Sequence, residues 1–99
     1  MPIISVLEEE FERLKQMEQA YIEKISSLPR GSITQKIIKG RPYYYLVYRE
    51  GSRVVTKYLK LNEKELRELQ SNLKQRQKLE KALREIRRDC RLLRKVVKR

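Results

Sequence analysis

The residues with the clearest binding chemistry lie between positions 36 and 60, where tyrosines are interleaved with lysines and arginines. Tyrosine rings can stack on unpaired bases, and basic side chains neutralise phosphates. Basic β-ribbons of this size can also enter the major groove of DNA. The alternative is that the tyrosines are structural, with hydroxyls that reach solvent. The candidate contact residues in this segment are Lys36, Arg41, Tyr43, Tyr45, Arg49, Arg53 and Lys57.

A second candidate is the basic run at the carboxyl end of the chain. Eight basic residues lie between positions 84 and 99, and only Glu85 and Asp89 oppose them. A stripe of this kind can follow a phosphate backbone. The alternative is that these side chains pair with glutamates of the first predicted helix or are simply solvated. Helical spacing places five of them along one stripe: Arg84, Arg87, Arg91, Arg94 and Lys98.

No residue pattern predicts catalysis, a metal site or a bound cofactor. The chain has no histidine, which is the usual general base near neutral pH, and its carboxylates lie in helical charge runs. Cys90 is the single cysteine, so it can form no intramolecular disulfide, and its place in an apolar repeat indicates a core residue. Glycine-rich phosphate loops are missing as well. We therefore expect a protein that is not an enzyme.

The first element that must position these residues is a helix over about residues 5–27. Ser5 and Glu8 predict a capping box at its start. Pro29 biases Leu28 away from helical angles, so the helix should end near residues 26–27. Its inward positions alternate at spacings of four and three, as in a coiled coil, and Met17 compensates for the one glutamate. These positions are Leu7, Phe11, Leu14, Glu18, Tyr21, Ile25 and Leu28.

Residues 32–60 predict a β-meander of three antiparallel strands. Residues 32–38, 43–49 and 53–59 have strand patterns, and turn signals lie at 39–42 and 50–52. Alternation puts Tyr43 and Tyr45 on one face of the middle strand, and Tyr44 and Tyr48 on the other. A lone three-stranded sheet has no core of its own, so we expect one face to cover the ends of the helices.

A second helix is predicted over about residues 62–97, with Asn62 and Glu65 as its capping box. Leu73 lies in a polar stretch where the apolar seam loosens. We therefore expect Leu73 to contribute less to stability than Leu83 or Ile86. The unbroken seam consists of Leu79, Leu83, Ile86, Cys90, Leu93 and Val97.

The predicted architecture is α+β: two long antiparallel coiled-coil helices joined by a three-stranded antiparallel β-meander, in one domain of residues 1–99. Sequence lengths place Leu28 near Asn62 and Leu7 near Leu83. That register leaves the last dozen or so residues of the second helix without a partner. Exposed apolar residues in such an overhang predict a homodimer through the C-terminal helix, or a partner helix. They are Leu92, Leu93, Val96 and Val97.

The charge of the chain also favours a polyanionic partner. The 99 residues contain 25 Lys and Arg against 13 Asp and Glu, a formal net charge of +12. No apolar run reaches membrane-spanning length, and the first residues turn acidic at once, so we expect no signal peptide and a cytoplasmic location. A membrane-surface binder is disfavoured because the C-terminal helix has no Trp or Phe to anchor it.

The meander also resembles known proteins. The segments that carry the resemblance are Leu28-Pro29-Arg30-Gly31-Ser32-Ile33, Gly40-Arg41-Pro42-Tyr43-Tyr44-Tyr45, Tyr48-Arg49-Glu50-Gly51 and Lys57-Tyr58-Leu59. They are similar to a family of small uncharacterised prokaryotic proteins that flank a tyrosine-rich hairpin with charged helices. This resemblance implies a fold pattern and no activity. The meander is also similar to the three-stranded DNA-binding arms of phage integrases and to the N-terminal strands of some transposases.

Together these observations predict a non-enzymatic accessory protein, such as one of a mobile element or phage, that binds nucleic acid. DNA is favoured over RNA. The alternative function is a coiled-coil interaction module whose basic surface serves solubility.

Overall fold

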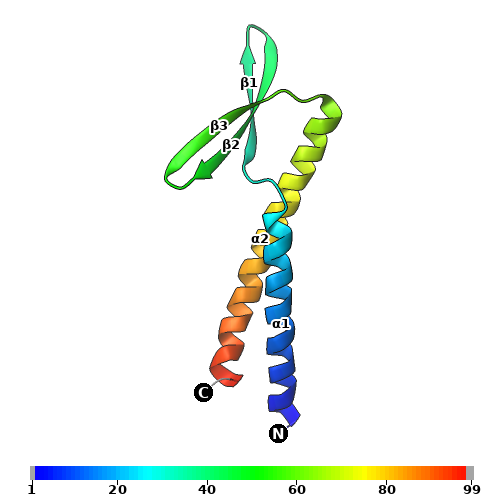
Figure 1. Cartoon of the computed structure of the whole chain (residues 1–99), viewed down its shortest axis with the longest axis vertical. Helices are drawn as coiled ribbons and strands as arrows, with labels where there is room; N and C mark the ends of the chain where they lie inside the picture. The colour runs from blue at the N-terminus through cyan, green and yellow to red at the C-terminus, as the bar shows by residue number, and fades with distance from the viewer. Residues whose placement is uncertain (1, 98–99) are drawn as a thin grey trace. The chain divides into compact units, whose positions relative to one another are not determined.

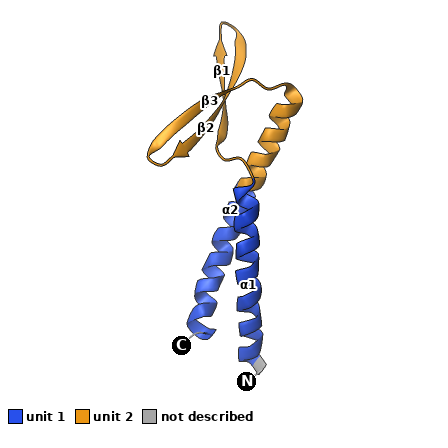
Figure 2. Ribbon diagram, viewed as in Figure 1, with its two compact units in different colours: residues 1–27, 77–99 blue, residues 28–76 orange. Residues whose placement is uncertain are grey.

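The computed structural model describes residues 2–97 of the chain. The helix–strand–helix order confirms the predicted α+β class, and the elements are α1 (Pro2–Ser26), β1 (Ser32–Ile38), β2 (Arg41–Glu50), β3 (Arg53–Leu59) and α2 (Glu63–Val97) (Figure 1). The chain divides into two compact units (Figure 2). Unit 1 combines the residues up to 27 with those from 77 onward, and unit 2 consists of residues 28–76.

Helix α1 begins earlier than predicted. Its first helical residue is Pro2, so Ser5 lies inside the helix and the predicted capping box is wrong. Proline suits this position because its fixed φ is helical and its missing N–H would have no partner in the first turn. The predicted end is confirmed at Ser26. There the hydroxyls of Ser26 and Ser27 donate to the carbonyl oxygens of Glu23 and Lys24, both at 2.7 Å.

Unit 1 is held together by the two predicted apolar seams. Phe11 and Leu14 of α1 form a buried cluster with Ile86 and Cys90 of α2. The helices run antiparallel, because Glu18 contacts Arg87 whereas the earlier residue Phe11 contacts the later residue Arg94. Four half-buried side chains pack around the cluster: Met17, Tyr21, Leu93 and Val97.

The helix register differs from the predicted one. The carbonyl oxygen of Leu28 accepts a hydrogen bond from the Arg76 guanidinium at 2.7 Å, whereas the sequence lengths placed Leu28 near Asn62. The prediction assumed that α2 starts beside the end of α1, but its first turns, up to residue 76, belong to unit 2. The predicted C-terminal overhang is accordingly wrong for Leu93 and Val97, which pack on the core.

The sheet is a meander in the order β1-β2-β3, with all pairs antiparallel. Its first turn is shorter than predicted, because only Lys39 and Gly40 have positive φ, at 52° and 78°. These angles are typical of the type I′ hairpin, whose twist matches that of the strands. Pro42 therefore lies in β2. Its missing N–H is tolerated because β3 ends opposite Tyr44 and does not extend alongside Pro42.

Helix α2 begins at the predicted capping box. The Asn62 side chain accepts from the backbone N–H of Glu65 at 2.8 Å, and the Glu65 carboxylate accepts from the N–H of Asn62 at 3.1 Å. The expected order of the leucines by their contribution to stability, however, changes. Leu73 is 6% exposed, which is close to the 7% exposure of Leu83 and of Ile86. Leu73 is therefore buried although its neighbours in the sequence are polar.

Every buried side chain among the described residues belongs to a helix. The strands keep all their side chains at least partly exposed, and the expectation that one sheet face covers the ends of the helices stays a prediction. The hydrogen-bonded ladders and ring contacts hold the sheet together instead of a buried core. The most exposed aromatic side chain of the sheet is Tyr58 of β3, at 52%.

Candidate nucleic-acid interface

One face of the sheet carries a cluster of three tyrosines, and we call it the tyrosine face. Tyr45 of β2 is paired with Tyr58 of β3, and cross-strand partners point to the same side. The ring centroid of Tyr58 lies 5.5 Å from that of Tyr45 and 6.1 Å from that of Tyr43, with tilted planes. Tyr58 is 52% exposed, whereas the two rings of β2 are half-buried.

Three basic residues share the tyrosine face. Lys36 is paired with Tyr43, and its ammonium lies 4.9 Å from the centroid of the Tyr45 ring. Arg41 and Arg49 lie at the two ends of β2 on the same side, because side chains alternate along a strand. Glu50 is the only acidic residue between positions 28 and 62, and alternation places it on the opposite face. The tyrosine face therefore carries cations without an opposing carboxylate.

The opposite face combines aliphatic side chains with Tyr44 and Tyr48, which are half-buried. It carries half-buried Ile33, Leu46, Val55 and Leu59, and we call it the aliphatic face. Arg53 and Lys57 lie on this side, since they pair with Glu50 and Leu46. The structure thus divides the predicted contact residues: five share the tyrosine face, namely Lys36, Arg41, Tyr43, Tyr45 and Arg49, and two do not.

The aliphatic face is closed at one corner. The Arg30 guanidinium lies 5.6 Å from the centroid of the Tyr48 ring. Next to it, a Cβ atom on Gly31 would lie 2.6 Å from the carbonyl oxygen of Val47. This corner therefore anchors the start of β1 by close packing, and we assign it a structural role.

Tyr58 was missing from the sequence-based set, although a signal for it exists. The two-residue turn at residues 51–52 places Glu50 opposite Arg53, and counting back along both strands places Tyr45 opposite Tyr58. No feature of the sequence indicates that Tyr58 is more exposed than Tyr45. This difference depends on Tyr58 lying on an edge strand while Tyr45 lies on the central one.

Basic charge is concentrated around the sheet. Residues 28–62 contain eight Lys and Arg but a single carboxylate, which leaves only seventeen basic and twelve acidic residues for the rest of the chain. The ion pairs that the structure describes lie in the helices: Glu10–Arg13, Glu12–Lys15, Glu63–Arg67 and Glu18–Arg87. The eight basic residues near the sheet are Arg30, Lys36, Lys39, Arg41, Arg49, Arg53, Lys57 and Lys60.

The predicted stripe on α2 is only partly free. Arg87 donates to the Glu18 carboxylate at 2.9 Å, as the alternative interpretation expected, and the Arg94 guanidinium lies 5.9 Å from the Phe11 ring centroid. Arg84 and Arg91 are exposed. Lys98 lies outside the described residues. The stripe therefore offers two free arginines, Arg84 and Arg91. They lie before and after Arg87, which is engaged with α1.

Residues 5–68 match the family described as a domain of unknown function, DUF6788. The chain belongs to this family. The DUF6788 segment contains the whole sheet, including the tyrosine face, and ends near the start of α2, before the basic stripe. No curated protein and no solved structure matches the chain.

The remaining reactive group of this DUF6788 protein, Cys90, is a core residue as predicted. Burial raises the pKa of its thiol, and the negative charge of Glu18 acts in the same direction, which disfavours the reactive thiolate. Among residues 2–97, no three His, Cys, Asp or Glu side chains are grouped as a metal site. Within the same range, no helix has the length and apolar character to cross a membrane.

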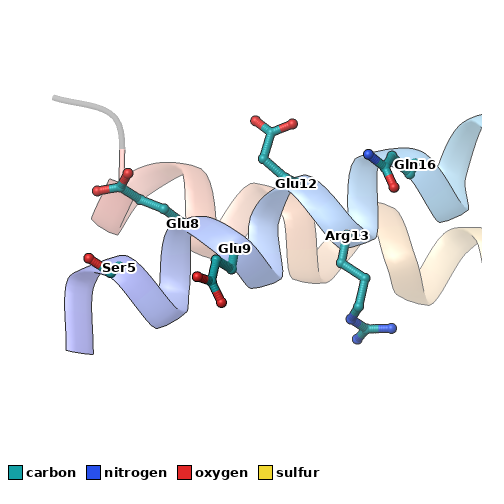
Figure 3. Close-up of a pocket in the computed structure, with 6 residues that line it drawn as sticks. All are labelled: Ser5, Glu8, Glu9, Glu12, Arg13 and Gln16. Atoms are coloured by element: carbon teal, nitrogen blue, oxygen red, sulfur yellow. The ribbon is translucent and has the colours of Figure 1, made fainter. Parts of the chain in front are cut away.

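A shallow hollow on α1 lies outside this basic region. It is lined by Ser5, Glu8, Glu9, Glu12, Arg13 and Gln16, which all come from one helix and point in different directions (Figure 3). The hydrogen bond from Arg13 lowers the pKa of the neighbouring Glu10 carboxyl. An acidic, open helix flank of this kind would repel a phosphate backbone, which leaves the sheet as the candidate interface.

Proposed function

We propose that this protein is a non-enzymatic nucleic-acid-binding protein, with DNA as the first ligand to test, and that the tyrosine face is its contact surface. The observation that carries the proposal is the combination of three unopposed cations with a partly exposed aromatic cluster on one face of the sheet. Basic side chains release counterions from the phosphate backbone, and aromatic rings add contacts with the bases.

The test is a salt series of binding, measured by fluorescence anisotropy with labelled single-stranded and duplex DNA and RNA. Arg41→Ala combined with Arg49→Ala removes two cations from the tyrosine face. We expect weaker binding and a salt slope flatter by about 1.5 units, since each lost phosphate contact contributes roughly 0.7–0.9. The direction of this change is the same for every sequence, because phosphate contacts carry no sequence information.

The matched control is Arg84→Ala combined with Arg91→Ala. These arginines are exposed, as are Arg41 and Arg49, and their loss changes the net charge equally. We expect the control to leave the salt slope nearly unchanged. Equal losses in both double variants would instead indicate a general charge effect. Absence of binding to every oligonucleotide at low salt would refute the proposal.

A second candidate function is protein interaction through the helices. Leu92 and Val96 are 58% and 52% exposed, and Leu92 lines a groove of unit 1 together with Glu10, Leu14, Asp89 and Leu93. These features favour coiled-coil packing of α2 against a second copy of the chain. Sedimentation equilibrium should then show a dimer that Leu92→Ser with Val96→Ser converts to monomer. A monomeric wild type at high concentration would rule this function out.

A further inference from the structure

The tyrosine face presents a single ring whose position is set by its neighbours. Tyr58 is half-exposed, and the rings of Tyr43 and Tyr45 contact it with interplanar angles of 49° and 55°. Rotation of the Tyr58 side chain is restricted by these contacts before any ligand arrives. A ligand that stacks on Tyr58 would therefore lose little additional side-chain entropy.

The cations frame this ring cluster along the strand. Arg41 and Arg49 are eight residues apart on β2, which corresponds to about 27 Å at 3.4 Å per residue. The tyrosines lie between them, and the Lys36 ammonium extends over the Tyr45 ring from β1. An extended polyanion along β2 could therefore meet a cation near each end and aromatic rings in between.

We propose that the tyrosine face selects single-stranded nucleic acid and stacks one unpaired base on the ring of Tyr58; this inference rests on the proposed function. In a duplex, the flat surface of each base is covered by the next base pair, and only the edges are exposed in the grooves. A ring cluster at the centre of the face can use its stacking surface only with an unpaired base. The arginines at the ends supply phosphate contacts for either strand type, so Tyr58 is the discriminating residue.

The experiment compares a labelled fifteen-nucleotide oligo(dT) with a fifteen-base-pair duplex at one salt concentration. Wild-type protein should bind the single strand at least about tenfold more tightly than the duplex. Tyr58→Ala should lower single-strand affinity about 5- to 140-fold, the usual effect of removing one base–aromatic stack, and leave the salt slope unchanged. Duplex binding should change less than about twofold, because this binding depends on the phosphate contacts.

Two further variants separate stacking from folding. Tyr58→Phe retains the ring and should keep near wild-type affinity. Val54→Ala alters an exposed position of β3 on the same face and should have no effect on binding. Quenching of tyrosine fluorescence by unlabelled oligo(dT) provides a readout in the wild-type protein, since five of the six tyrosines lie in the sheet.

The outcomes distinguish this inference from the proposed function. Equal affinity for duplex and single strand, or a folded Tyr58→Ala variant with unchanged affinity, would refute single-strand stacking. The proposed function would survive either result if the Arg41 and Arg49 variant still lost binding. Failure of the wild type to bind any oligonucleotide would refute both.

Discussion

Replacing Leu73 by Ala is expected to destabilise the protein about as much as replacing Leu83. Both side chains are almost fully buried, at 6% and 7% exposure. Loss of a buried leucine side chain typically costs about 2–5 kcal/mol, which combines lost transfer free energy with the cavity left behind. A chain of this size has roughly 5–15 kcal/mol of total stability, so either change removes a large share of it.

Thermal unfolding provides the assay. For a domain of this size, 1 kcal/mol shifts the melting temperature by about 4–8 °C, so a cost of about 3 kcal/mol corresponds to roughly 12–24 °C. Circular dichroism follows the helices, whereas tyrosine fluorescence mainly follows the sheet, because five of the six tyrosines lie there. Since Leu73 belongs to unit 2 and Leu83 to unit 1, comparing the two probes shows whether the units unfold together.

Leu92→Ala is the matched control, because Leu92 lies on the same helix but is 58% exposed. We expect a change of less than about 0.5 kcal/mol. The reasoning fails if Leu73→Ala behaves like this control while Leu83→Ala lowers the melting temperature by more than 10 °C. That result would mean that Leu73 is exposed in solution, as its polar neighbourhood in the sequence predicted.

Two other substitutions test the local structure. Gly31→Ala should destabilise the protein by about 2–3 kcal/mol, because a Cβ is unfavourable at a φ of +116° and would clash with the Val47 carbonyl oxygen. Gly40→Ala is the control: its φ is +78° but the space around it is open, so it should cost only about 1 kcal/mol. Equal melting temperatures for the two variants would contradict the close packing at Gly31. Asn62→Ala removes the cap of α2 and should cost about 1 kcal/mol in urea unfolding, while Asn72→Ala, inside the helix, should be neutral or slightly stabilising.

The sequence predicted the elements whose signals are local. The cap at Asn62, the helix end near Ser26 and the turn at Gly51 each depend on a few neighbouring residues, and the structure places them as expected. Ser5 shows the limit of a local signal. A serine followed by a glutamate is compatible with a helix start, but it is equally compatible with a helix that began at Pro2.

The helix register could not be predicted, because the apolar positions of both helices repeat every seven residues. Leu28 lies beside Arg76 instead of Asn62, a displacement of fourteen residues along α2. Fourteen residues are two heptads, so sliding one helix by this distance leaves the apolar seam of α1 facing the apolar seam of α2. The apolar pattern therefore predicts which sides of the helices meet but not where along their lengths. Arg87 illustrates the consequence, since its partner Glu18 follows only from the observed register.

The candidate site was predictable in part. Alternation along β2 correctly places Tyr43, Tyr45 and Arg49 on one face, and the hairpin turns fix which residues of β1 and β3 join them. Exposure was not predictable, because an amphipathic strand pattern does not say whether anything covers the sheet. The expectation of a covered face followed from the usual behaviour of small sheets, and here every strand side chain remains partly exposed.

The open edges of the meander bear on the colloidal behaviour of the protein. Strands β1 and β3 each have one outer edge without a neighbouring strand in the sheet, and exposed Ile37 and Ile38 lie at the end of β1. Such edges favour pairing with another molecule and aggregation. The concentrated positive charge of residues 28–62 opposes this pairing by repulsion between copies. Salt screens that repulsion over about 10 Å at 0.1 M and about 3 Å at 1 M. Concentrated solutions should therefore remain clear at low ionic strength and become turbid as salt is added.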